Sequence, residues 1–177
     1  INKNIKVVLP SHYYCFNMKH KHIDKVKYYN IPDRIVEEPK DRIVKNIREK
    51  IESAVDNELI SDVPVCTILS GGIDSVIITY LLSKKVKNLE AFVVSNGINE
   101  KKKDDLYYAR KASEFMKIPL NEIIIDDEYV MNNLKDTIYA VEDFKWVQVS
   151  PAVAQLPMSK AIHEKGYKVV FGGEGSD

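Results

Sequence analysis

The chain has 177 residues, of which 45% are hydrophobic and 29% charged, a balance typical of a globular protein large enough for a buried core. Equal numbers of basic and acidic residues, 26 of each, argue against a broad nucleic-acid-binding surface, so we expect no nucleic-acid partner. No apolar stretch is long enough to span a bilayer, so we expect no membrane partner. With only two cysteines, a disulfide framework is not expected, and we predict a cytoplasmic location.

The first third of the chain shows weak patterns. Residues 5–9 predict a short strand that ends at Pro10, and residues 13–16 predict a second one. His20 and His22 lie in a lysine-rich turn. The pair could bind a metal ion, and the alternative is that both side chains are simply solvated. An apolar stripe over residues 39–59, which we expect to face inward, predicts a helix.

From residue 63 onward, strand and helix patterns alternate. Strands are predicted over 63–69, 89–94, 120–125 and 168–171, and helices over 73–85, 104–117, 128–141 and 151–164, the last with a break or kink at Pro157. Trp146 is expected in a loop before the last helix. Such alternation is typical of an α/β fold with a parallel sheet.

Three loops follow predicted strands, over residues 70–75, 95–105 and 172–177. Ligands of open parallel sheets bind outside the carboxyl ends of the strands. We therefore expect these loops to converge on one crevice.

The first of these loops, Ser70–Ser75, has the composition of an anion-binding turn. Gly71 and Gly72 allow a tight reversal, and backbone N–H groups at the start of the next helix can bind phosphate. The loop lacks the lysine of a P-loop. Asp74 would repel a phosphate unless a cation such as Mg²⁺ lay between them. The alternative is a structural glycine turn in which Asp74 stabilises the helix N-terminus.

The last loop carries Glu174 and Asp177 among glycines. If it lies near the first loop, its carboxylates could supply one metal ligand and one proton acceptor. A polar turn without a catalytic role is the alternative.

These motifs carry a family resemblance. The SGGIDS sequence at Ser70–Ser75 matches the SGGxDS signature of the N-type ATP pyrophosphatases. Together with the SDVP sequence at 61–64 and the GEGSD sequence at 173–177, it resembles the synthetase domain of B-type, glutamine-hydrolysing asparagine synthetases. The segment 9–13 is similar to the PGHY segment that follows the glutaminase domain there, with Ser11 in place of glycine. The likeness spans nearly the whole chain.

The resemblance implies a Rossmann-like sheet of the adenine nucleotide alpha hydrolase type, flanked by helices and incomplete at the C-terminus. Residues 1–35 would follow a glutaminase domain absent from this sequence, and residues 36–177 would be the N-terminal part of the synthetase domain. We expect a longer polypeptide, since the sequence starts at Ile1 and stops inside a loop. A homodimer is left open.

The resemblance further implies ATP-dependent amide formation. A carboxylate, aspartate in the first instance, would attack the α-phosphate of ATP and release pyrophosphate. Ammonia from glutamine would then displace AMP to give asparagine. Relatives that close β-lactam rings, cyclise lasso peptides or amidate sugar acids remain alternatives, as does a non-catalytic nucleotide-binding module. A tRNA-thiolating activity is disfavoured, because Cys66 lies within a predicted strand.

Site residues follow from matched positions in this sequence. Glu174 matches the glutamate that accepts a proton from the amine, and Asp74 and Asp177 match the carboxylates that bind Mg²⁺. The remaining matches are to residues around ATP and pyrophosphate: Leu69, Ser70, Gly71, Gly72, Asp74, Ser75, Val94, Asp105 and Gly173. Two departures, Ser95 for a glycine and Gly172 for a serine, concern contacts with the adenosine.

Overall fold

The computed structural model describes residues 3–33, 35, 37–97 and 104–174. The chain forms two compact units, residues 1–44 and 45–177, which are described separately. The boundary expected after residue 35, between the segment that would follow a glutaminase domain and the synthetase domain, stays a prediction. Within the described residues, no helix is long and apolar enough to cross a membrane.

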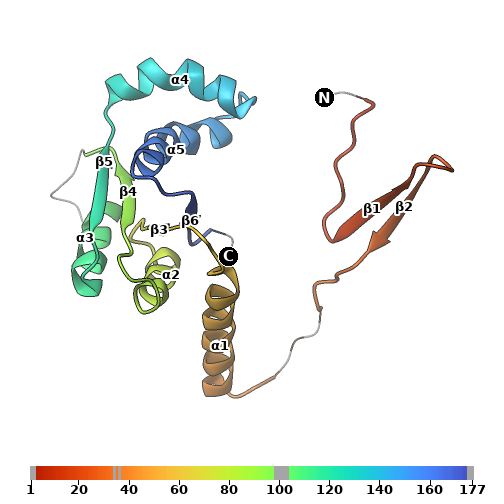
Figure 1. The fold of residues 1–177 in the computed structure, drawn as a ribbon, viewed down its shortest axis with the longest axis horizontal. Coiled ribbons are helices and arrows are strands. Elements are labelled where there is room, and N and C mark those ends of the chain that lie inside the picture. Colours follow the sequence, from red (N-terminus) through yellow and green to blue (C-terminus); the bar gives the residue numbers. More distant parts are fainter. Residues whose placement is uncertain (1–2, 34, 36, 98–103, 175–177) are drawn as a thin grey trace. The chain divides into compact units, whose positions relative to one another are not determined.

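The larger unit is built on a four-stranded parallel sheet (Figure 1). Its strands are β3 (Val65–Ile68), β4 (Ala91–Ser95), β5 (Leu120–Ile124) and β6 (Val169–Phe171). They lie in the order β5-β4-β3-β6, so the chain moves outward from β3 to β5 and then returns to the other side of β3. The predicted α/β fold is confirmed, and the strand order reverses between β3 and β6, where such sheets bind ligands.

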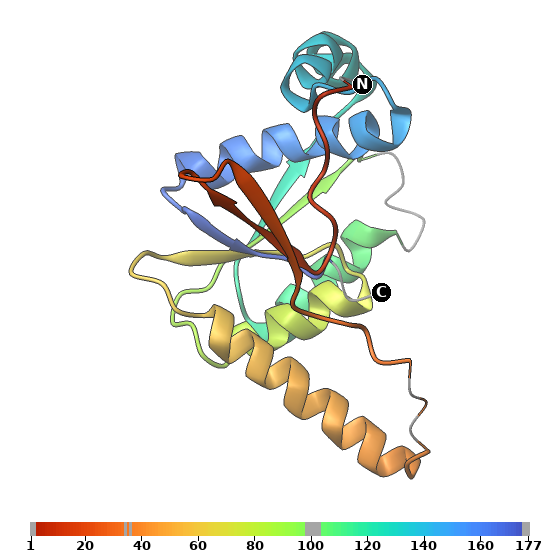
Figure 2. The same ribbon diagram turned by 90° about the vertical axis from the view of Figure 1, so that its right-hand side faces the viewer.

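Helices cover both faces of this sheet. They are α2 (Ile73–Ser83), α3 (Asp105–Met116) and α5 (Trp146–Glu164), and α4 (Asp127–Val141) packs against α5. Figure 2 shows the blue α5 on one side of the strands and the green α2 and α3 on the other. Alternate residues of β4 therefore meet different helices: Ala91 and Val93 pack with Leu106 of α3, whereas Phe92 packs with Met158 of α5.

α5 differs from its prediction. The helix begins at Trp146, which was expected in a loop, and it runs through Pro151 and Pro157. Of the break or kink expected at Pro157, the break does not occur. Each proline removes a backbone hydrogen bond from a helix interior. The buried side chains on the sheet-facing side of α5 offset this loss, namely Val149, Val153, Met158 and Ile162.

α1 (Lys40–Glu58) confirms the predicted helix but only part of its expected inward face. Val55 is its one buried residue among those described. It packs with Leu82 of α2 and with Leu89. The C-terminal half of the predicted stripe therefore contributes to a buried core, whereas Ile43 and Ile47 are exposed.

The smaller unit contains an antiparallel hairpin of β1 (His12–Asn17) and β2 (His22–Lys27). The strand predicted over 13–16 is confirmed within β1, whereas residues 5–9 form no strand. Asn17 closes the turn, because its side-chain oxygen accepts hydrogen bonds from two backbone N–H groups. His22 lies 3.2 Å from Asp24, and the described residues hold no cluster of three metal-binding side chains.

A polar cluster ties the start of β6 to the rest of the sheet. Lys165, just after α5, places its ammonium 2.6 Å from the carboxylate of Glu90, which precedes β4. Asn121 of β5 donates to the same carboxylate at 2.8 Å. The Lys165 ammonium holds the pKa of Glu90 below its usual range, while burial and then Glu90 raise the pKa of Tyr167. The cluster thus fixes the α5–β6 connection, which leads into the second glycine loop.

We predict that Glu90→Gln destabilises the fold at neutral pH by about 1 kcal/mol, because both partners of the ion pair are partly exposed to solvent. The Glu90 pKa is depressed in the folded state, so its contribution is present above the ordinary pKa of 4.5 and is lost as pH falls through the folded value. Urea unfolding of wild type and variant from pH 7 to pH 3 measures this difference. A difference that stays constant over this range, or that persists in the background of Lys165→Met, would contradict the ion-pair origin.

Candidate active site

The first glycine loop (Ser70–Ser75) follows β3 and is anchored in the core at its start. The Leu69 side chain is fully buried, and its backbone N–H donates to the carbonyl of Phe92 at 2.9 Å. Gly71 has a φ of +82°, a conformation that side chains rarely adopt. A Cβ there would also lie 2.5 Å from the carbonyl oxygen of Asp105 and 2.9 Å from the nitrogen of Ala109. The loop is therefore pressed against the first turns of α3, and glycine is required for both reasons.

Two serines hold the loop in shape. The hydroxyls of Ser70 and Ser75 lie 3.0 Å apart, and the Ser75 hydroxyl donates to the carbonyl of Gly72 at 3.0 Å. Gly72 is the N-cap of α2 and provides no side-chain cap. The first backbone N–H groups of a helix lack carbonyl partners within the helix, so this end of α2 is suited to bind an anion.

The second glycine loop (Gly172–Asp177, described as far as Glu174) follows β6 and meets the first loop directly. A Cβ on Gly173 would lie 2.6 Å from the backbone nitrogen of Ser75 and 2.9 Å from the carbonyl carbon of Asp74. Only a residue without a side chain allows this approach. Of the three loops expected to converge, the first and the third meet as far as Glu174. Residues 98–103 of the second loop lie outside the described residues, and its described residues do not line the same cavity.

The strands below hold the loops together. β3 and β6 pair in parallel, with Thr67 opposite Phe171. The Thr67 side chain is fully buried, and its hydroxyl lies 3.0 Å from that of Thr79 and donates to the carbonyl of Phe171 at 3.3 Å. The contact between the loops is thus supported from the strands and from α2.

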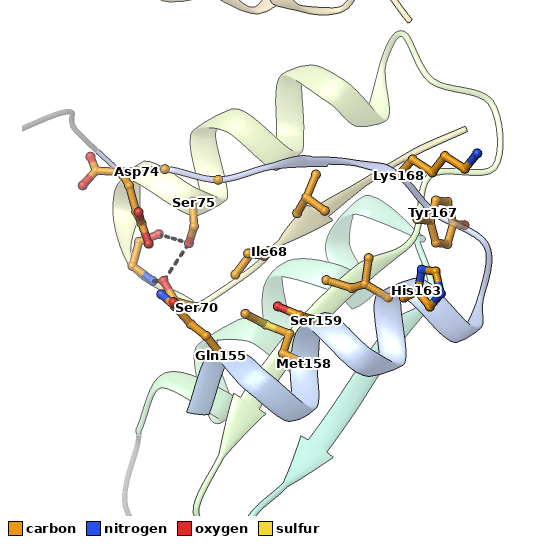
Figure 3. Close-up of a pocket in the computed structure, with 16 residues that line it drawn as sticks. Ile68, Ser70, Asp74, Ser75, Gln155, Met158, Ser159, His163, Tyr167 and Lys168 are labelled. Carbon is orange, nitrogen blue, oxygen red and sulfur yellow. Dashed lines mark hydrogen bonds between the residues drawn. The ribbon is translucent and has the colours of Figure 1, made fainter. Parts of the chain in front are cut away.

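A cavity of about 780 Å³ opens beside the two loops (Figure 3). The loops contribute Ser70, Gly72, Asp74, Ser75, Gly172, Gly173 and Glu174 to its lining. Ile68 and Val170 contribute from β3 and β6. The remaining lining residues come from α5 and the connection to β6: Gln155, Met158, Ser159, Ile162, His163, Tyr167 and Lys168.

Charge is unevenly distributed around this cavity. Asp74, which is half-buried, and Glu174, which is exposed, line it at the loop end, whereas His163 and Lys168 line it at the far end in Figure 3. Two carboxylates beside a helix N-terminus give an acidic edge to an anion-binding loop. Mg²⁺ is held in proteins by one or two carboxylates together with substrate phosphates, so this donor set fits a phosphate-bound Mg²⁺.

Some predicted site residues do not line the cavity. Leu69 is buried in the core, so only its backbone could contact a ligand, and Val94 packs on the α5 side of the sheet. Asp105 opens α3, and its carbonyl oxygen faces Gly71. Their roles around adenosine and pyrophosphate stay predictions, and Asp177 lies outside the described residues.

The α5 wall is the part of the cavity that sequence reasoning missed. Gln155, Met158, Ser159 and Ile162 have the spacing i, i+3, i+4, i+7, which places them on one helix face. The same spacing is typical of any helix that packs on a core. The one added signal is that two of the four are polar.

Cys66 shows the opposite case, a reactive residue type without a role at the site. Burial, followed by the charge of Glu90, raises the pKa of its thiol to about 11. It packs with Phe92 and Met158 in the core. This agrees with the interpretation of Cys66 as a core residue.

A parallel sheet with an anion-binding helix N-terminus at the reversal of its strand order defines the class of nucleotide-binding α/β proteins. Within that class, residues 46–177 match the family model described as asparagine synthase. The chain belongs to the asparagine synthase family.

Curated relatives agree with this assignment. The chain is 25% identical to "Amidase chyE" of Penicillium rubens over 197 residues, which cover 99% of this chain and 28% of that protein. It is 27% identical to "Asparagine synthetase [glutamine-hydrolyzing]" of Cricetulus griseus over 192 residues, which cover 98% of this chain and 34% of that protein. The chain thus spans about a third of the length of these relatives.

Among solved structures, the "U34-tRNA thiolase NcsA from Methanococcus maripaludis with its [4Fe-4S] cluster" has a TM-score of 0.55 and 22% sequence identity. The match covers 73% of this chain and 45% of that chain. At this identity the likeness concerns the fold alone.

We predict that Gly71→Ala destabilises the protein more than Gly166→Ala does. The two glycines have nearly the same φ, +82° and +84°, but nothing lies within 4 Å of a Cβ at Gly166. Gly166→Ala should therefore cost the conformational strain alone, about 1–2 kcal/mol. Gly71→Ala should cost about 2 kcal/mol beyond this because of the collision with α3. Thermal and urea unfolding measure both, and equal losses would contradict close packing of the loop against α3.

Proposed function

We propose that the chain carries the ATP-cleaving site of an ATP-dependent amide-forming ligase. A substrate carboxylate oxygen attacks the α-phosphorus of ATP, the bond to the β-phosphate oxygen breaks, and pyrophosphate leaves. The nitrogen of ammonia then attacks the acyl carbon of the adenylate, and AMP leaves with the electron pair of the broken C–O bond. The products are an amide, AMP and pyrophosphate.

The observation that carries this proposal is the contact of Gly173 with the backbone of Asp74 and Ser75. It brings a loop suited to bind phosphate within reach of Glu174, and both border one cavity. Membership of the asparagine synthase family supports the same chemistry.

The first glycine loop binds and orients the leaving pyrophosphate. Backbone N–H groups at the start of α2 point toward the anion, and the Ser70 and Ser75 hydroxyls, already 3.0 Å apart, can turn toward its oxygens. The core and the packing of Gly71 against α3 already hold the loop, so it loses little conformational entropy when the nucleotide binds.

Mg²⁺ is part of the proposal. Asp74 would hold the ion together with Asp177, and its charge would neutralise the phosphates as pyrophosphate leaves. Without a cation, the half-buried Asp74 would repel the nucleotide that the loop binds.

Glu174 accepts the proton that the attacking nitrogen loses. An ammonium ion has no lone pair and cannot attack, and the nitrogen carries an excess proton after attack. A carboxylate in the cavity that also borders the phosphate loop is suited to remove it.

For the substrates, we propose aspartate as the acid and glutamine, through a glutaminase domain outside this chain, as the source of ammonia. The match to asparagine synthetases favours this choice. An amidase relative of similar identity favours a second candidate, in which the same adenylation serves another acid or amine.

Pyrophosphate release from ATP tests the proposal. The intact protein is incubated with ATP, Mg²⁺ and ammonia, alone and with aspartate or other carboxylic acids. Release that depends on aspartate, with asparagine as product, is expected. Release with another acid alone would favour the second candidate, and no release with any acid would favour a non-catalytic nucleotide-binding protein.

Glu174→Gln should separate the two half-reactions. Adenylate formation, followed by isotope exchange between pyrophosphate and ATP, should remain near the wild-type rate. Amide formation should fall about a hundredfold or more, because the proton acceptor is lost. Glu164→Gln, at a glutamate on α5 outside the cavity lining, is the matched control and should change neither step. An equal loss of both steps in Glu174→Gln would contradict the proton-acceptor role.

A further inference from the structure

The cavity is longer than the phosphate loop, and its far wall is one face of α5. Met158 and Ile162 on this face are only 5% and 6% exposed, because they pack against the sheet. Gln155 and Ser159 alternate with them and are exposed along the cavity. The wall therefore combines an apolar base with polar groups above it.

The floor of the cavity has the character of a site for a flat ring. Ile68 of β3 and Val170 of β6 line it from the sheet, and Ile68 packs against the core cluster that contains Met158 and Ile162. Val170 is exposed, so an apolar surface remains open beside α5. A purine has apolar faces and a polar edge, so it can lie on such a surface while its edge meets polar side chains. This surface begins near the first glycine loop, and a nucleotide bound there by its phosphates must place its base nearby.

Gln155 is the polar residue of α5 nearest to this loop. Figure 3 shows it beside Ser70, at the loop end of the cavity, whereas Ser159 and His163 lie farther along. No hydrogen bond engages the Gln155 side chain within the part of the chain that the structure describes. Its amide is thus available to a ligand.

A side-chain amide presents an NH₂ donor group and a carbonyl acceptor at a fixed spacing. Adenine presents a complementary pair, the N6 amino group and the N7 acceptor, whereas guanine presents two acceptors, O6 and N7. A glutamine beside the base edge therefore favours adenine. With guanine, the amide oxygen would face O6 or N7, and neither of the two facing acceptors would receive a hydrogen bond.

We propose that Gln155 is a specificity-determining residue that binds the edge of the purine and selects ATP over GTP. The inference rests on the proposed function in that it takes a purine nucleotide as the ligand. Binding measurements without turnover can nevertheless test it separately.

The test compares the affinities of the intact protein for ATP and for GTP, each with Mg²⁺, by isothermal titration calorimetry. Wild type should bind ATP more tightly. Gln155→Met keeps the length of the side chain and removes its hydrogen bonds, so ATP affinity should fall about tenfold to a hundredfold while GTP affinity changes little. Gln155→Arg supplies two donors to O6 and N7, so the ratio of affinities should move toward GTP.

Gln148→Met is the matched control, since Gln148 is an exposed glutamine of the same helix that does not line the cavity. It should leave both affinities at the wild-type values. An equal loss of ATP and GTP affinity in Gln155→Met would overturn the proposal, because it would place Gln155 at the phosphates or ribose. An ATP-to-GTP ratio unchanged within twofold in both Gln155 variants would overturn it as well.

The two proposals fail in different ways. A wild-type protein that prefers ATP through Gln155 but releases no pyrophosphate with any acid would contradict the ligase and support the base-reading residue. A protein that releases pyrophosphate with aspartate but shows no dependence of nucleotide preference on Gln155 would do the reverse.

Discussion

The contact between two backbones, Gly173 against Asp74 and Ser75, is the constraint on which the site depends. A Cβ at Gly173 would lie 2.6 Å from the backbone nitrogen of Ser75, so this position cannot carry a side chain unless one of the loops moves. The sheet makes this contact possible, because β3 and β6 are neighbours although about a hundred residues separate them. Residues from both loops therefore line one cavity.

The first glycine loop is fixed from several directions before any ligand binds. The buried Leu69 holds its start, Gly71 is packed against α3, and the serine pair links its ends. Groups that are already in place can bind a ligand with little further loss of conformational freedom. The second loop is held less directly, through the pairing of β6 and through the ion pair of Lys165 with Glu90.

One face of α5 both packs on the sheet and borders the cavity. Its buried side chains cover the sheet, and polar ones between them border the cavity. The apolar contacts keep the helix continuous through two prolines, so the position of Gln155 depends on packing well away from it. The proposed binding of the base and the proposed cleavage of ATP thus use different elements around the same cavity, α5 and the two glycine loops.

The sequence by itself determined the parallel α/β fold and the two glycine loops that follow β3 and β6, because local sequence patterns specify these features. Alternating strand and helix periods, and glycines where the backbone must turn, need no distant partner to be recognised. It also indicated family membership through two motifs at the ends of different strands. Where local patterns were weak or conflicting, as at residues 5–9 and at Trp146, the expectations were wrong.

Only the tertiary structure decided which residues share the cavity. Gln155 and Ser159 occupy ordinary helix positions in the sequence, and their place opposite Ile68 results from the packing of α5 on the sheet. Leu69, adjacent to the loop in sequence, is instead buried in the core. The physical reason is that periodicity specifies the face of an element, whereas the neighbour of that face is set by long-range packing, which no local pattern records.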